Sequence, residues 1–60
     1  MAHPYAKAKS LYVYGQHYAA SGQIDLARER YDAALAILRQ LGEELYAAHV
    51  ERALTQVSAR

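Results

Sequence analysis

Histidine is the side chain best suited to metal binding and to acid–base chemistry, and this chain has three, His3, His17 and His49. Two ligands on one helix face need a spacing of three or four residues. No pair of these histidines has that spacing, and the chain contains no cysteine. The sequence therefore predicts no metal site within one chain, and it leaves open a surface site shared between chains.

The hydroxyl and carboxyl groups are no better placed for catalysis. Ser10 and Ser21 have no neighbouring histidine–acid arrangement of the kind that activates a nucleophile. Glu43 and Glu44 are adjacent at the expected start of a helix, where carboxylates stabilise the positive end of the helix dipole. We therefore expect a protein that is not an enzyme and that uses no cofactor.

The charge balance limits the partners that the chain can have. Its 60 residues include seven basic and six acidic side chains, for a net charge of +1. This composition is too balanced for a nucleic-acid-binding surface, which normally carries a basic stripe. No apolar run approaches the roughly 20 residues of a membrane-spanning helix. We expect no nucleic-acid or membrane partner, and a soluble, cytoplasmic protein.

The elements that carry these residues are predicted to be helices. Apolar residues recur at helical spacing in three stretches, at about 4–20, 24–41 and 43–58, within a single domain 1–60. Pro4 suits a first helical position, and Gly22 and Gly42 suit the left-handed conformation that ends a helix. Two short connections make consecutive helices antiparallel neighbours. The predicted fold is all-α, with three antiparallel helices.

Gly15 lies in the middle of the first expected helix, where a glycine costs about 1 kcal/mol relative to alanine. A close approach by another backbone is the usual reason for such a residue. Leu11 and Tyr18 share its helical face, at four residues before and three after. We therefore expect a close contact at Gly15 between the first and second helices.

Seven residues at fixed spacing resemble the tetratricopeptide repeat, a helix–turn–helix unit with the pattern Trp-x-x-Leu-Gly-x-x-Tyr followed by a small–aromatic–small set on the second helix. The match covers about residues 8–41, and the third helix resembles the first helix of a following repeat. The resemblance implies a hairpin plus one further helix, a fragment of an α-solenoid. The seven matching residues are Leu11, Tyr14, Gly15, Tyr18, Ala27, Tyr31 and Ala34.

The whole chain is also similar to the C-terminal helical region of LuxR-type and related ATPase-coupled transcriptional regulators. In that family the helical region senses effectors or partners, whereas other domains bind nucleotide and DNA. This sequence contains no P-loop pattern of glycine and lysine, so the resemblance implies the scaffold only. The segments that carry it are His3-Pro4-Tyr5, Ala27-Arg28, Ala33-Ala34-Leu35, Leu41-Gly42, Ala47-Ala48 and Ala53-Leu54.

Two surfaces are candidates for binding. The resemblance implies a concave face on the first helix, where Lys9, Tyr12 and Gln16 would face a peptide. The third helix has no further helix to cover it, and its apolar residues predict an oligomer interface. A two-fold homodimer is the commonest such assembly. The residues expected at that interface are Leu45, Tyr46, Ala48, Val50, Leu54 and Val57.

The sequence thus predicts a protein–protein interaction module that assembles with itself or binds another protein. Two alternatives remain open. One is a sensor fragment of a larger transcriptional regulator, and the other is a small peptide-binding adaptor that uses the concave face of the first helix.

Overall fold

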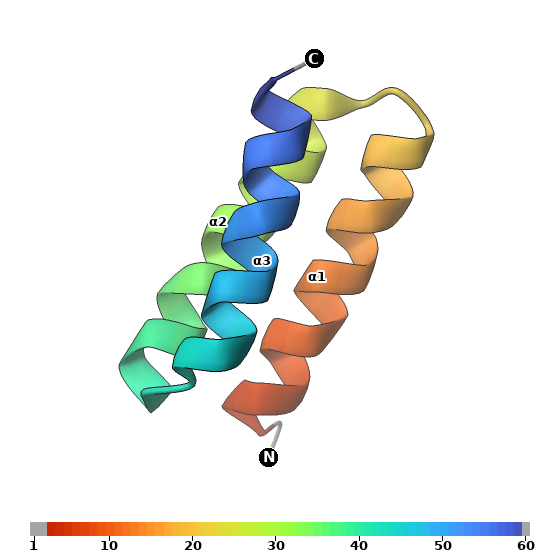
Figure 1. Ribbon diagram of the computed structural model, residues 1–60. Helices are drawn as coiled ribbons and strands as arrows, with labels where there is room; N and C mark the ends of the chain where they lie inside the picture. Colours follow the sequence, from red (N-terminus) through yellow and green to blue (C-terminus); the bar gives the residue numbers. More distant parts are fainter. Residues whose placement is uncertain (1–2, 60) are drawn as a thin grey trace.

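The computed structural model describes residues 3–59 and contains three helices in that range. They are α1 (Pro4–Ala20), α2 (Ile24–Leu41) and α3 (Glu44–Ser58). The fold is all-α, and the helices run up, down and up, so that the two ends of the chain lie at opposite ends of the molecule (Figure 1). The bounds match the expected ranges except at Glu43, which precedes α3 as its N-cap.

The two turns are built in the same way, and each depends on a glycine. Gly22 and Gly42 have φ angles of 81° and 74°. These values lie in the left-handed region, which glycine adopts readily because it has no Cβ. At the end of α2 the amide of Glu43 donates to the carbonyl of Leu38 (3.0 Å), and that of Gly42 donates to Arg39 (3.2 Å). This pair of bonds satisfies carbonyls that the helix end would otherwise leave free.

The turn after α1 repeats the arrangement. Gln23 donates to the carbonyl of Tyr18 (2.9 Å), and Gly22 donates to that of Ala19 (3.1 Å). Each turn reverses the chain within a few residues, so α2 returns along α1 and α3 returns along α2. The result is a thin molecule with principal extents of 32 × 22 × 12 Å.

The core lies on both sides of α2, which is the central helix in packing terms. It contributes five buried residues, and most of the core side chains are small, so the helices approach one another closely. α1 contributes only Ala8 and Gly15, and α3 contributes three residues. The buried residues of α2 and α3 are Ala27, Tyr31, Ala34, Leu35, Leu38, Ala47, Val50 and Val57.

Gly15 lies directly against the ring of Tyr31, at the centre of the α1–α2 interface. A Cβ added to Gly15 would be 2.5 Å from Cε1 of Tyr31 and 2.7 Å from its Cδ1. Tyr31 is only 2% exposed, so its ring has little room to move away. The glycine therefore provides the space that this tyrosine occupies.

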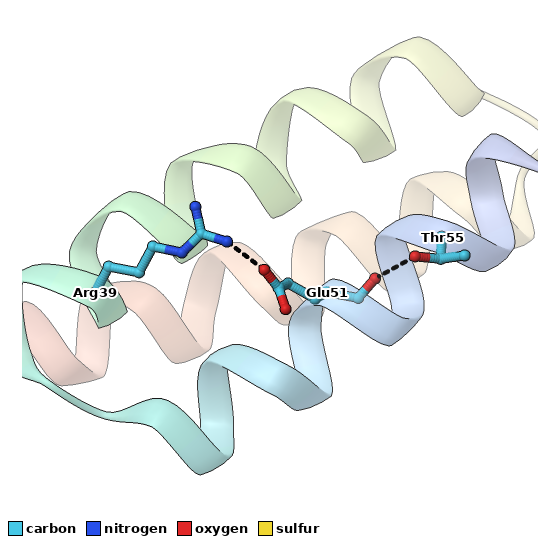
Figure 2. Close-up of polar contacts among 3 residues, drawn as sticks. All are labelled: Arg39, Glu51 and Thr55. Atoms are coloured by element: carbon cyan, nitrogen blue, oxygen red, sulfur yellow. Dashed lines mark hydrogen bonds and ion pairs between the residues drawn. The ribbon is translucent and has the colours of Figure 1, made fainter.

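One ion pair connects α2 to α3. The guanidinium of Arg39 donates to the carboxylate of Glu51 (Figure 2). Thr55 lies one turn further along α3, and its hydroxyl donates to the backbone carbonyl of Glu51 at 3.0 Å. The side chains of Arg39 and Glu51 are 63% and 50% exposed, so water screens their attraction. The pair therefore contributes little to the free energy of folding, although it joins α2 to α3.

Within residues 3–59, none of the helices combines the length and the apolar character that a bilayer-spanning helix needs.

Candidate functional site

A cluster of aromatic rings packs between α1 and α3. Tyr12 is at its centre: its ring centroid is 5.8 Å from those of Tyr31 and Tyr46, and 5.4 Å from that of His49. Tyr5 extends the cluster toward the start of α1, with its ring 5.8 Å from Tyr46. Most of these pairs meet edge to face, the favoured arrangement for aromatic rings. Long side chains thus join two helices whose backbones have few close approaches.

Two phenols of this cluster, those of Tyr31 and Tyr46, ionise less readily than an ordinary tyrosine because their pKa values are raised. Burial raises the pKa of Tyr31 above its ordinary value of 10.0, and the charge that Tyr12 carries when ionised raises it further. Burial likewise raises the pKa of Tyr46, with smaller contributions from Tyr12 and Tyr5. Both phenols are therefore neutral at physiological pH. The Gln16 amide donates to the Tyr12 hydroxyl at 3.1 Å and orients it.

A small groove of about 140 Å³ opens beside this cluster, between α1 and α3. Two of the three residues expected to face a peptide, Tyr12 and Gln16, line it. Tyr12 is half-buried and packs against the core, so its ring is part of the fold as well as of the groove wall. The remaining lining residues are Ala19, Tyr31, Ala53, Gln56 and Val57.

Lys9, the third residue expected to face a peptide, lies elsewhere. Its ammonium is 5.3 Å from the ring centroid of Tyr5, within reach of a cation–π interaction. It borders a different, shallow hollow of about 360 Å³ on the exposed side of α1, together with Ser10, Val13 and Tyr14. The structure therefore does not bring the three predicted peptide-facing residues to one surface.

The seven residues of the repeat-like pattern also differ in their burial. Gly15, Ala27, Tyr31 and Ala34 are buried, and Leu11 and Tyr18 are partly buried against the core. Tyr14 is 58% exposed, so its assignment as a packing residue is wrong. Successive residues of an α-helix are about 100° apart around its axis. Because Gly15 faces α2, the adjacent Tyr14 is turned toward the outer side of α1.

The interface predicted on α3 is mostly used inside the molecule. Val50 and Val57 are 0% and 4% exposed, and Tyr46 and Leu54 are partly buried against the core, so these four residues do not form an outer surface. The reason is that α3 packs its main apolar stripe on α2. Leu45, at 91% exposed, and the exposed Ala48 remain available on the outer side of α3.

The sequence reasoning missed Val13, which is 59% exposed beside Tyr14. A signal was present, because the apolar and aromatic residues at 11–14 follow one another without a break and therefore surround the helix. We define the α1 outer face as the residues that line its shallow hollow, Lys9, Ser10, Val13 and Tyr14. We define the α3 outer face as Glu44, Leu45 and Ala48, all of them exposed.

The chemically reactive types lie apart from one another. Ser21 donates its hydroxyl to the His17 carbonyl at 3.1 Å, which is a local helix-end contact. His49 lies among tyrosine rings, and Ser10 belongs to the α1 outer face. Between residues 3 and 59, no three histidine or carboxylate side chains are grouped as metal ligands.

The residues that the structure describes form a small all-α fold of three antiparallel helices. Comparisons of the chain with family models, with curated proteins and with solved structures give no match. The resemblance to tetratricopeptide repeats therefore stays a prediction.

Proposed function

We propose that this chain is a non-catalytic protein–protein interaction module that assembles with copies of itself. The observation that carries the proposal is the exposure of large apolar side chains on two helices. Leu45 is 91% exposed, and Val13 and Tyr14 are 59% and 58% exposed. The buried core meanwhile consists largely of alanine and valine with one glycine. Exposed apolar surface of this kind marks interaction sites.

Size and charge support the same proposal. A chain of 60 residues buries only about 60% of the surface that its unfolded form exposes, so association would add stability that the small core lacks. A net charge of +1 gives little repulsion between copies. Electrostatic repulsion therefore does not prevent two copies of the chain from associating.

The test is the solution mass of the wild type beside a surface variant, Leu45→Gln. We expect light scattering to give a wild-type mass above the 6.7 kDa of one chain, and a lower mass for the variant. Ala36→Gln, at an exposed position of α2, is the matched control and should behave as the wild type. A wild type that stays at 6.7 kDa up to its solubility limit would contradict the proposal.

A peptide-binding adaptor is the second candidate, and the α1–α3 groove favours it. Gln16 and Gln56 line this groove with the Tyr12 hydroxyl. Amide side chains of this type can hydrogen-bond to the backbone of an extended peptide. Peptides selected by phage display should lose binding to a Gln16→Ala, Gln56→Ala chain that keeps its helical content. Equal binding by this variant would exclude the groove.

We further propose that α1 and α2 form a hairpin of the tetratricopeptide type and that α3 begins a second one, either alone or within a larger cytoplasmic regulator. The contact between Gly15 and Tyr31 supports this, because the repeat pattern has a glycine on its first helix and an aromatic residue on its second. Adding a second copy of residues 21–41 after α3 should raise the melting temperature, since repeats stabilise their neighbours. An added segment whose amides exchange freely would argue against a repeat.

A further inference from the structure

The ionic charges are distributed unevenly along the three helices. α1 carries Lys7 and Lys9 and no acidic residue. α2 is balanced, with three acidic and three basic residues. α3 and its N-cap carry Glu43, Glu44 and Glu51 against the single Arg52. The first helix is therefore basic and the third is acidic, although the whole chain is nearly neutral.

Each of these two helices also presents exposed apolar atoms beside its charges. On the α1 outer face, Val13 and Tyr14 lie with Lys9 around a shallow, mainly apolar hollow of about 360 Å³. On the α3 outer face, Leu45 is the most exposed large apolar side chain in residues 3–59, and it is flanked by Glu44. One face offers an open apolar depression with a cation, and the other offers an apolar projection with an anion.

We propose that these two faces bind each other between copies, so that the α3 outer face of one chain docks on the α1 outer face of the next. This proposal rests on the self-assembly proposed above and names its geometry. Leu45 enters the hollow beside Val13 and Tyr14, and the carboxylates at the start of α3 meet the lysines of α1. Burial of the leucine side chain favours association, and opposite charges at the rim favour this pairing over others.

Charge disfavours the simpler symmetric contacts. Two α1 outer faces placed together would bring two copies of Lys9 into one interface, and two α3 outer faces would bring two copies of Glu44 into one interface. Like charges across an interface disfavour association. Only the unlike pair combines apolar contact with opposite charges. We infer that each copy uses its two outer faces for two different neighbours, which makes the contact head-to-tail. Such a contact produces open chains with one free face at each end, or closed rings, and not the two-fold dimer expected from frequency alone.

Mixing two variants tests the geometry. Val13→Glu blocks the α1 outer face, because it replaces an apolar contact with a charge that repels Glu44. Leu45→Gln blocks the α3 outer face. Both positions are exposed and both new residues favour helix at least as well as valine does, so folding should persist, which circular dichroism checks. Each variant alone should lose at least about tenfold in association affinity.

In a head-to-tail assembly, each variant retains the face that the other lacks. An equimolar mixture should therefore form a one-to-one dimer and nothing larger by sedimentation velocity. Two monomeric variants that stay monomeric when mixed would overturn the head-to-tail contact. If the wild type nevertheless associates, self-assembly as the function would stand, whereas a monomeric wild type would remove both.

A charge variant supplies an independent readout. Lys9→Glu should weaken association and reduce its dependence on salt, because it removes an attraction that salt screens. Arg28→Glu, at an exposed position of α2, changes the net charge by the same amount and should leave association close to that of the wild type. Equal effects of the two variants would mean that net charge, and not the α1 outer face, governs association.

Discussion

The two sides of α1 carry side chains of different sizes. Its inner face meets α2 through two buried residues of the smallest types, Ala8 and Gly15. The larger Leu11 and Tyr18 are partly buried on the same face. Its outer face exposes Val13 and Tyr14, both larger than the residues that it buries. A helix that served only the fold would place its bulkier side chains inward.

The contrast separates two uses of apolar residues. α2 shows the usual pattern, because its buried residues form one stripe that includes Tyr31, Leu35 and Leu38. On α1, Gly15 makes room for Tyr31, and Val13 and Tyr14 are left for the surface. The inner face therefore determines stability, and the outer face is where we propose that binding occurs. Substitutions on the two faces should accordingly change different quantities.

Gly15→Leu should have the largest effect. Even a single added carbon would be 2.5 Å from the buried Tyr31 ring, so the longer side chain has no space without separating α1 from α2. We expect the variant to lose its cooperative thermal transition, as followed by circular dichroism. A melting curve like that of the wild type would show that the inner face does not control the fold.

Gly15→Ala sharpens this prediction, because two effects oppose each other. Alanine improves helix propensity by about 1 kcal/mol, whereas overpacking costs about 1–3 kcal/mol. We expect a net loss of stability. In a Tyr31→Leu background the ring is gone, so the same change at Gly15 should become favourable. Urea unfolding of the four chains measures the coupling, and additive effects would argue against the steric contact.

Leu38→Ala should have the next largest effect. Leu38 is 0% exposed on the central helix, and truncation of a buried leucine costs about 2–5 kcal/mol. Leu41→Ala, three residues further along and 44% exposed, is the matched control and should cost less than about 1 kcal/mol. Chemical denaturation measures both. Similar losses at the two positions would mean that the core does not lie where the structure places it.

High pH should destabilise the protein to a smaller extent. The pKa values of Tyr31 and Tyr46 are raised in the folded state, above the ordinary value of 10.0. Unfolded chains therefore lose these protons first, so the stabilisation is complete below about pH 10 and is lost as the pH rises through the folded-state pKa values. Tyr31→Phe should flatten this fall in melting temperature. An equally steep fall in this variant would show that the Tyr31 hydroxyl does not cause it.

The Arg39–Glu51 pair should have the smallest effect. Both side chains are at least half exposed, and exposed ion pairs contribute about 0–1 kcal/mol. A double-mutant cycle of Arg39→Ala and Glu51→Ala should give a coupling energy in that range that shrinks at high salt. A larger, salt-independent coupling would show that the pair does more for the α2–α3 contact than its exposure implies.

Local signals in the sequence were enough to predict the helices and the contact at Gly15. Gly22 and Gly42 mark both turns, and a glycine inside a helix pointed to a close neighbour. The rotation of each helix could not be obtained in this way. Tyr14 and Gly15 are adjacent, and only the packing against α2 decides which of them is buried.

The same limit explains the errors on α3. Its apolar stripe was a single set in the sequence, and whether Val50 and Val57 met α2 or another molecule depended on tertiary packing. The ion pair between Arg39 and Glu51 joins residues 12 apart on different helices, which no helical spacing rule identifies. Val13 was visible only as an uninterrupted apolar run with no partner assigned to it.

The best test of whether the outer faces of α1 and α3 bind each other between copies is sedimentation velocity of the wild type over a wide dilution series. We expect the average mass to rise steadily with concentration and not to stop at two copies. A mass of 6.7 kDa at every concentration, or a plateau at twice that value, would contradict it.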